Sequence, residues 1–261
     1  MKKPLLDVIF ASEKRKNVLL LLQDGPRGMK YILDQLETTR QALLPHVRIL
    51  EDYHLITDSM DTYELTDIGK LIVNKMTHLV SITEVLDTDI DFWGTRKLDF
   101  LPSPLLNRIN ELGKCRVISP PVTDIFELDK DITDTSYKSR SLSMIAASLH
   151  PGYPHLFNEL AHKGINIRAI FSKSVFDSMK SNYSTYLEEL IKNESFNLYV
   201  YSEKMDFLAF VYNDFNFLMR MLKVDGTTDN KYILCKNPPT LRWTNDFFEY
   251  YLKDSTPITE L

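Results

Sequence analysis

Apolar runs and polar breaks in the first fifth of the chain predict three short helices. Ser12 is of a residue type that often caps the start of a helix. The five consecutive apolar residues at 18–22 that follow predict the central helix of a small bundle. Residues 28–36 carry one apolar stripe and predict a shorter second helix. Residues 38–52 predict a third helix, because their apolar positions recur at helical spacing. Its inward-facing residues are expected to be Leu43, Val47 and Leu50.

After the predicted helices, apolar and polar residues alternate, which predicts a small β-hairpin. Residues 54–57 and 62–65 alternate around the polar stretch 58–61. Helix, turn, helix and hairpin in this order are typical of a winged helix-turn-helix, whose second helix enters a DNA groove. The segment Leu65-Thr66-Asp67-Ile68-Gly69 favours this interpretation, because Leu-Thr-x-x-Gly leaves the wing and caps the next helix in many ArsR-like and MarR-like proteins. The alternative is a dimerisation or protein-docking module that does not touch DNA.

The polar face of the third helix predicts contacts to DNA. Arginine can bind guanine edges, glutamine adenine edges, and an exposed leucine the thymine methyl group. We expect Arg40 and Gln41 to contact bases, and Lys30 and Arg48 to contact phosphates. Pro45 removes one backbone bond, at about 3 kcal/mol in a helix interior, and predicts a kink or an early start of the last turn. The expected DNA-binding set is Lys30, Thr39, Arg40, Gln41, Leu44 and Arg48, with Thr38 or Thr39 as the helix cap.

Charge weakens the case for tight non-specific DNA binding. The net charge is −5, whereas phosphate binding relies on lysine and arginine. Residues 1–86 hold 11 basic and 12 acidic side chains, but residues 27–48 hold four basic and two acidic ones. The positive charge is therefore concentrated in the second and third predicted helices, at residues 27–48. The acidic hairpin tip would repel phosphate, so little DNA contact is expected from the wing.

A long helix is predicted from Asp67 to about Ile90. Two seven-residue apolar series run along it and predict a short coiled-coil-like seam. The series are Ile72, Leu79 and Leu86, and Met76, Thr83 and Ile90. One interpretation is a homodimer, because two DNA-binding domains related by a two-fold axis would match the two halves of a palindromic operator. The other is packing of the helix against the chain's own C-terminal domain.

The second half of the chain predicts an α/β domain. Strands are expected at 115–118, 142–147, 165–171 and 232–235, a hairpin at 207–222, and helices at 122–138, 153–163 and 241–252. Strand, helix and strand with short loops imply a parallel pair. The expected fold is thus α+β and α/β: a winged helix-turn-helix at 1–85, connecting helices at 86–118, and an α/β effector domain at 119–261.

Cysteine usage and hydropathy suggest a cytoplasmic protein. Cys115 and Cys235 lie far apart without a CxxC partner, and reduced thiols are expected. A signal-peptide pattern is not visible after Met1-Lys2-Lys3, and no apolar run approaches the roughly 20 residues of a membrane-spanning helix.

Catalytic chemistry is not predicted. His150, His155 and His162 cluster in sequence but lack the His-x-Lys phosphodiesterase pattern and a metal-ligand spacing, so each is expected to have a surface or capping role. Nucleophile-elbow, Walker and dinucleotide-binding motifs are missing from the sequence. We expect no metal, no cofactor and no enzymatic activity, with a phosphodiesterase-like enzyme as the minor alternative.

Two segments near the end resemble the closing motif of an archaeal regulator family that carries a methanogenesis regulatory protein middle domain behind a winged helix. They read Asp225-Gly226-Thr227-Thr228-Asp229 and Leu241-Arg242-Trp243-Thr244-Asn245-Asp246-Phe247-Phe248-Glu249-Tyr250-Tyr251. Residues 92–102 and 105–109 resemble that family's linker. The sequence departs at Thr228, Leu241 and Thr244, where the family favours Tyr, Ala and Gly. The resemblance implies an archaeal transcription regulator whose C-terminal domain is similar to a degenerate phospholipase-D-type fold used for sensing.

An effector site is expected near the end of the chain. Tyr232, Trp243, Phe247 and Tyr250 are candidates to line an apolar pocket for an unidentified small molecule, although core packing is the alternative for all four. Double-stranded operator DNA is the expected partner of the N-terminal domain.

Overall fold

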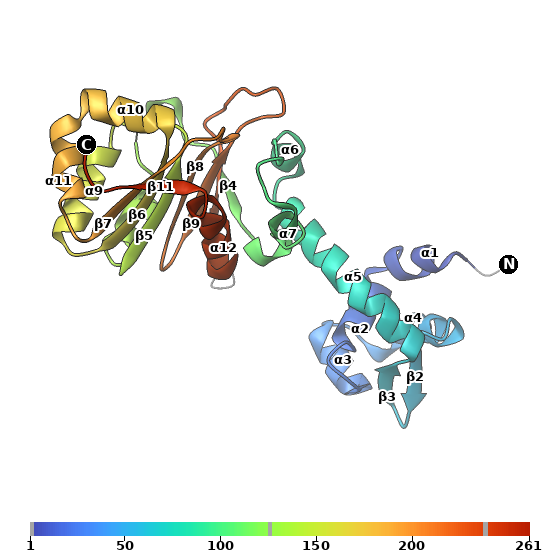
Figure 1. The fold of residues 1–261 in the computed structure, drawn as a ribbon. Coiled ribbons are helices and arrows are strands. Elements are labelled where there is room, and N and C mark those ends of the chain that lie inside the picture. Colours follow the sequence, from blue (N-terminus) through green and yellow to red (C-terminus); the bar gives the residue numbers. More distant parts are fainter. Residues whose placement is uncertain (1–2, 125–126, 237–239) are drawn as a thin grey trace. The chain divides into compact units, whose positions relative to one another are not determined.

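The computed structural model describes residues 3–124, 127–236 and 240–261 (Figure 1). The backbone divides into two compact units, Met1–Ser81 and Ile82–Leu261. The boundary falls inside helix α5 (Asp67–Leu86), so each unit contains one part of this helix.

Unit 1 contains the predicted helices and hairpin. Before α5 its helices are α1 (Leu5–Phe10), α2 (Glu13–Leu21), α3 (Met29–Gln35) and α4 (Arg40–Asp52). Strands β1 (Arg27–Gly28), β2 (Ile56–Ser59) and β3 (Thr62–Leu65) pair in the order β1-β3-β2 within the described residues. Ser12 caps α2 as predicted, because its hydroxyl accepts the Arg15 N–H. The sequence analysis missed α1, a short helix held in place by burial of Val8 and Ile9.

The segment from Leu65 to Gly69 joins β3 to α5 in the predicted way. The Thr66 hydroxyl donates to the His54 carbonyl at 2.6 Å and accepts the Gly69 N–H at 3.0 Å. A β-carbon at Gly69 would collide with the Leu55 carbonyl oxygen. Threonine supplies the cap and glycine allows the close approach, which explains the Leu-Thr-x-x-Gly spacing.

Helix α5 contributes to two different cores. Val73 and Met76 are buried in the core of unit 1, whereas Val85 is buried in a core of unit 2. The seam predicted through Met76, Thr83 and Ile90 is therefore wrong for Met76, because the fold of unit 1 already covers it. The apolar side chains that remain exposed on α5 are Ile68, Leu71 and Leu79, of which only Leu79 belongs to a predicted series. None of the described helices is long and apolar enough to cross a membrane.

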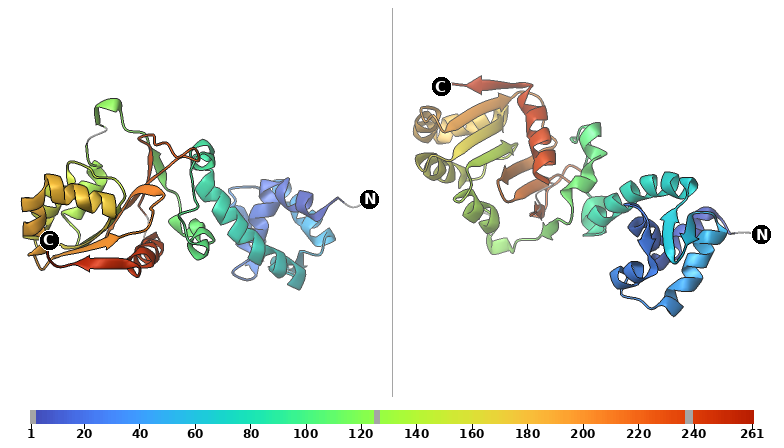
Figure 2. Two further views of the ribbon diagram at one scale, coloured as in Figure 1. Left: turned by 45° about the horizontal axis from the view of Figure 1, so that its top comes forward. Right: turned by 90° about the horizontal axis from the view of Figure 1, so that it is seen from below.

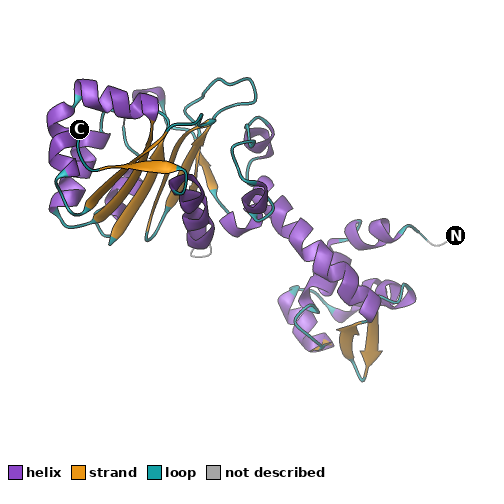
Figure 3. Ribbon diagram, viewed as in Figure 1, coloured by secondary structure: helices purple, strands orange, loops and turns teal. Residues whose placement is uncertain are grey.

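Unit 2 is built on an eight-stranded sheet, counted over the residues described (Figure 3). The strand order is β11-β7-β6-β5-β8-β9-β10-β4. The strands are β4 (Arg116–Ile118), β5 (Ser141–Ala146), β6 (Asn166–Ser172), β7 (Phe196–Tyr201), β8 (Phe207–Asn213), β9 (Phe217–Met221), β10 (Tyr232–Cys235) and β11 (Ser255–Ile258). The predicted parallel pair is confirmed as β5 and β6, and β7 continues it in parallel. The sequence analysis missed β7 and β11.

Helices cover both faces of this sheet (Figure 2). They are α6 (Ile90–Gly94), α7 (Ser103–Leu106), α8 (Lys130–Ser136), α9 (Tyr153–His162), α10 (Lys173–Asn182), α11 (Ser184–Ile191) and α12 (Thr240–Leu252). Helices α9 and α10 contact β6, α11 contacts β7, and α8 contacts β8, while α12 contacts β5, β7 and β9. Two separate apolar cores result, one on each face. Of the single helix expected at 122–138, the described residues show a 3-10 turn at Val122–Asp124 and α8, while residues 125–126 lie outside the described part.

The connecting segment 86–118 packs into unit 2. Phe92, Trp93 and Leu105 are buried in the same core as Trp243 and Phe247 of α12. The indole N–H of Trp243 donates to the Leu105 carbonyl at 2.9 Å, and Arg96 forms a bidentate ion pair with Asp229. Residues that the sequence suggested were only a connection are thus part of the fold of unit 2.

The two cysteines form a disulfide, so the expectation of reduced thiols is wrong. Cys115 and Cys235 are bonded, with their Cα atoms 4.3 Å apart. Strand β4 pairs antiparallel with β10, and Leu234 lies opposite Arg116. This register places the neighbouring positions 115 and 235 side by side although 120 residues separate them in sequence. The sequence contained no signal for this pairing, because it depends on a contact between distant strands.

Candidate nucleic-acid interface and ligand pocket

Helix α4 presents a polar face supported by an apolar one. Leu43, Val47 and Leu50 are buried in the core of unit 1, as predicted. Thr39 caps the helix, because its hydroxyl accepts the Ala42 N–H at 3.3 Å. The helix runs from Arg40 to Asp52 with Pro45 inside it, so the proline does not interrupt the assigned helix.

Most of the side chains expected at DNA lie on the exposed surface of unit 1. Gln41 and Arg48 project from α4 and Lys30 from α3, all three exposed. Leu44 is only half-buried, which leaves part of its side chain available to a ligand. Thr39 is exposed but its hydroxyl is engaged in the cap.

Arg40 is held by the wing. Its guanidinium donates to both carboxylate oxygens of Asp61, at 2.7 Å and 2.6 Å. Met60 and Asp61 form the tight turn of the β2–β3 hairpin with φ angles of 52° and 64°, which is the backbone expected of a two-residue hairpin turn. The hydrogen bonds raise the pKa of Arg40 and lower that of Asp61. The acidic tip, expected only to repel phosphate, thus binds the residue expected to read a base.

One basic residue beside α4 was missed by sequence reasoning. The Lys14 ammonium, on α2, donates to the Ala42 carbonyl at 3.4 Å in the first turn of α4. His46, also on α4, contacts the Ser12 hydroxyl at 3.1 Å, and burial together with Arg15 and Lys14 lowers its pKa. Lys14 lies in the first turn of α2, and its sequence context carries no pattern that points to α4. The packing of Lys14 against α4 adds positive charge next to the candidate DNA interface.

The structure does not bring the four candidate ligand residues into one pocket. Trp243 and Phe247 are fully buried in one core, stacked with ring centroids 5.6 Å apart. Tyr232 belongs to the core on the other face of the sheet, and its hydroxyl donates to Asp129 at 2.6 Å. Tyr250 is 39% exposed and lies beside the Lys253 ammonium. Tyr232 lies on β10 and faces the opposite side of the sheet from α12, and Tyr250 lies on the exposed side of α12.

A different pocket lies on the face of the sheet that carries α8 and α9. A cavity of about 200 Å³ lies over β5, β8 and β9, and it meets a more open groove of about 760 Å³. Strands supply Leu142, Met144, Val211 and Leu218, and the loop after β5 supplies residues 148–151. This loop follows the carboxyl end of β5, where the strand order reverses, since β6 and β7 lie on one side of β5 and β8 on the other. Ligands of open α/β sheets bind at such switch points.

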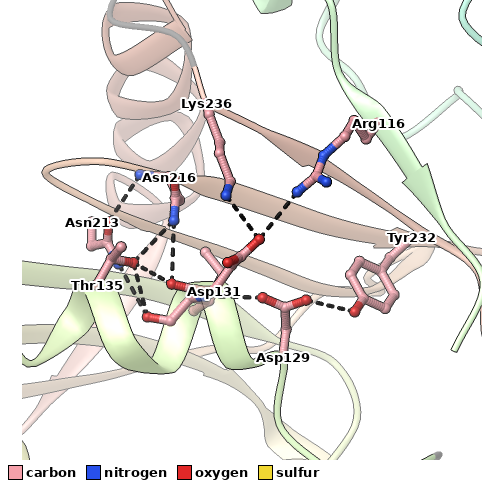
Figure 4. A network of polar contacts seen from close by, with 9 residues as sticks. Arg116, Asp129, Asp131, Thr135, Asn213, Asn216, Tyr232 and Lys236 are labelled. Carbon is pink, nitrogen blue, oxygen red and sulfur yellow. Dashed lines mark hydrogen bonds and ion pairs between the residues drawn. The ribbon is translucent and has the colours of Figure 1, made fainter.

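Helix α8 forms one wall of this pocket and is tied to the sheet by polar side chains (Figure 4). The Asp131 carboxylate pairs with Lys236 at 2.8 Å and with Arg116 at 3.1 Å. The buried Asn213 amide donates to the Thr135 and Ser136 hydroxyls at 2.9 Å and 3.0 Å. These contacts hold a seven-residue helix that is too short to be stable alone.

His150 and Arg220 lie where the cavity and the groove meet, since both residues line both. His150 Nδ1 accepts the Gly152 N–H at 3.0 Å. Burial, and secondarily Arg220, lowers the pKa of His150. The guanidinium of Arg220 lies 4.9 Å from the ring centre of Tyr232, and no described carboxylate forms an ion pair with it. His150 was expected to have a surface or capping role, and it does cap the turn at Gly152, but it also lines the pocket.

The other histidines stay outside this pocket's apolar part. His155 pairs with Glu159 at 3.4 Å, and His162 contacts the Asn158 carbonyl at 2.8 Å. Among the described residues, no group of three or more His, Cys, Asp or Glu side chains could hold a metal ion.

Sequence comparisons agree with the resemblance. Residues 4–84 match the profile of the N-terminal domain of methanogenesis regulatory protein FilR1, and residues 125–254 match that of its middle domain. The methanogenesis regulatory protein FilR1 of Methanothrix harundinacea (strain 6Ac) is 24% identical over an alignment of 258 residues that covers 97% of this chain. The chain spans 58% of the length of that curated relative.

Structural likenesses are looser. TrmBL2, described as an archaeal chromatin protein with a novel mode of DNA binding, overlays with a TM-score of 0.44 at 10% identity, covering 95% of this chain and 94% of its own. NucT from Helicobacter pylori overlays with a TM-score of 0.41 at 12% identity, covering 56% of this chain and 99% of its own. The family assignment rests on the sequence matches alone: the chain belongs to the FilR1 family of methanogenesis regulatory proteins and carries both its N-terminal and its middle domain.

Proposed function

We propose that this regulator binds operator DNA through unit 1, as a homodimer, and binds a small-molecule effector through unit 2. The observation that carries the DNA-binding part is the exposed face of α4. Gln41 and Arg48 project from a helix whose opposite face is packed in the core and whose start is capped by Thr39. Base-reading side chains on a rigid, supported helix are what major-groove recognition requires.

Gel-shift titration tests the DNA-binding part. We expect the chain to bind a duplex from its own upstream region more tightly than a scrambled duplex at physiological salt. Gln41→Ala should lose about 1–3 kcal/mol on the operator and relax specificity at one base pair. Arg48→Ala should weaken binding to both duplexes alike and reduce the salt slope by about one. Equal affinity of the unchanged chain for both duplexes would exclude operator recognition.

The homodimer is supported by the exposed apolar residues of α5. Ile68, Leu71 and Leu79 are 54%, 68% and 52% exposed and recur at spacings that place them along one side of the helix. Such a stripe on a helix matches a second copy of itself across a two-fold axis. Sedimentation analysis should show a dimer that Leu71→Glu dissociates and that Lys70→Gln leaves intact, because Lys70→Gln makes the same charge change at an exposed position on another side of α5. A monomeric unchanged chain at micromolar concentration would contradict the dimer.

The effector part is supported by the pocket beneath α8 and by the family's regulatory role. A ligand bound there can favour one distance between the two DNA-binding domains of the dimer over another. The ligand thereby changes the affinity for DNA. We infer that unit 2 acts by binding and not by catalysis. A thermal-shift screen of metabolites, followed by DNA titration with each hit, tests this. If hits leave operator affinity unchanged, the chain is a constitutive regulator.

A further inference from the structure

We propose that the cavity over β5, β8 and β9 binds a small monocarboxylate with an apolar body, whose carboxylate is held by Arg220 and His150. The inference rests on the proposal that unit 2 binds an effector, and it adds the ligand's chemistry and its binding residues.

The inner part of the site is apolar. Leu142, Met144, Leu156 and Val211 line it together with Leu218. All five side chains are at most 6% exposed, so the cavity lies within the fold and not on its outer surface. A cavity of about 200 Å³ with such walls suits a short alkyl chain or a single ring.

Arg220 supplies the cation at the entrance of the cavity. It comes from β9, lines both the cavity and the groove, and forms no ion pair with any carboxylate of the described residues. Its guanidinium carbon lies 4.9 Å from the centre of the Tyr232 ring, within the range of a cation–π contact. A planar guanidinium with free donors matches the two oxygens of a carboxylate.

His150 supplies a neutral donor beside that cation. Because Nδ1 accepts the Gly152 N–H, the neutral imidazole carries its proton on Nε2. Nε2 is buried and has no partner among the described residues. A buried donor without a partner is costly, and a ligand oxygen would satisfy it.

The acidic residues around the site select for a single negative charge. Glu127 and Asp129 line both the cavity and the groove. The Asp129 carboxylate is already engaged by the Tyr232 hydroxyl at 2.6 Å and the Ile132 N–H at 2.8 Å. These two carboxylates repel any second negative charge on the ligand, so a monocarboxylate facing Arg220 is favoured over a phosphate dianion.

Calorimetric titration of the full chain with hexanoate, 1-hexanol and hexyl phosphate tests the proposal. We expect hexanoate to bind at least tenfold more tightly than 1-hexanol, and more tightly than hexyl phosphate. Arg220→Met should weaken hexanoate binding at least tenfold and leave 1-hexanol binding unchanged. Arg140→Met is the matched control, because the Arg140 side chain is 95% exposed and lies outside the cavity lining.

A second variant protects the test against misfolding. Ala209→Leu places three more carbon atoms in the cavity and should shift the preferred carboxylate from hexanoate towards butyrate. Circular dichroism melts identify any variant that has not folded, and Arg220→Lys then replaces Arg220→Met as the cation test, with intermediate affinity expected. Equal binding of hexanoate and 1-hexanol, tighter binding of hexyl phosphate, no binding of any probe, or indifference to position 220 would each overturn the proposal.

DNA titration separates this inference from the wider effector proposal. If hexanoate binds through Arg220 but leaves operator affinity unchanged, the site stands and the sensing role fails. If another compound changes operator affinity equally in the unchanged chain and in Arg220→Met, sensing stands and this site fails.

Discussion

At the scale of single residues, the ion pair of Arg40 with Asp61 bears most directly on the proposed DNA binding. The two side chains are about half exposed, so their attraction is screened by water and contributes little to stability. Their geometry matters more, because both carboxylate oxygens occupy the guanidinium that was expected to read a base. Under the proposed function, DNA has to displace Asp61 before Arg40 can contact a guanine.

Asp61→Asn should therefore increase DNA affinity. The change removes a negative charge at the wing tip and releases Arg40. We expect tighter binding to operator and scrambled duplexes, and a salt slope steeper by about one for the added phosphate or base contact. Fluorescence anisotropy across a salt series measures both. Asp58→Asn is the control, since it makes the same charge change on the hairpin without an ion pair to Arg40. Equal gains for both variants would show that charge alone, and not the release of Arg40, is responsible.

At the scale of elements, α8 depends on side chains from other parts of unit 2. Its seven residues make few internal backbone bonds, while Asn213 and Asn216 from the β8–β9 turn donate to its carbonyls and hydroxyls. Asn213 also accepts the Phe215 and Asn216 N–H groups at 2.9 Å, so one buried amide orders both the helix and the turn.

Asn213→Ala should loosen α8 and destabilise unit 2 by about 1–3 kcal/mol, because buried hydroxyl and N–H groups lose their partner. Urea unfolding followed by tryptophan fluorescence reports this, since both tryptophans, Trp93 and Trp243, lie in unit 2. Asn197→Ala, at an exposed position of β7, should have little effect. A loss below about 0.5 kcal/mol would contradict the anchoring role.

Asp131 makes this anchoring dependent on pH. The Lys236 ammonium, with help from Arg116, holds the pKa of Asp131 below its usual value of 3.8. Since the folded-state pKa is the lower one, the contribution to stability is present above about pH 3.8 and is lost as the pH falls through the folded-state value. After solvent screening it amounts to about 1 kcal/mol or less. Unfolding curves between pH 6 and pH 2 should show a smaller acid-induced loss in Asp131→Asn than in the unchanged chain.

At the scale of the whole molecule, the disulfide fastens the edge strand β4 of unit 2 to its neighbour β10. Cys115 and Cys235 are separated by 120 residues, so the bond restricts a long stretch of the unfolded chain. Reduction should lower the free energy of unfolding of unit 2 by about 2–5 kcal/mol. Differential calorimetry with and without reductant measures this, and the double variant Cys115→Ser, Cys235→Ser should not respond to reductant. Rapid alkylation of both cysteines in the native, unreduced chain would contradict the bond.

The sequence by itself determined what depends on neighbours along the chain. The spacing of apolar residues determined where α2, α3 and α4 of unit 1 form. The hydroxyls of Ser12 and Thr39 determined where α2 and α4 begin. The Leu-Thr-x-x-Gly segment determined the turn into α5. The strand–helix–strand order set the parallel pair β5–β6, because a short connection through a helix leaves no other arrangement. The residues of the closing motif and of the linker were enough to indicate the family to which the chain belongs.

Only the tertiary structure decided what depends on contacts between distant residues. The register of β10 on β4 joined Cys115 to Cys235, and the hairpin turn brought Asp61 to Arg40. The two faces of the sheet divided Tyr232 from Trp243, and the fold of a loop over β5, β8 and β9 created the pocket at His150 and Arg220. Periodicity states which side of an element is buried but not which other element covers it. Partners across the fold are set by packing and strand register, which no local pattern encodes.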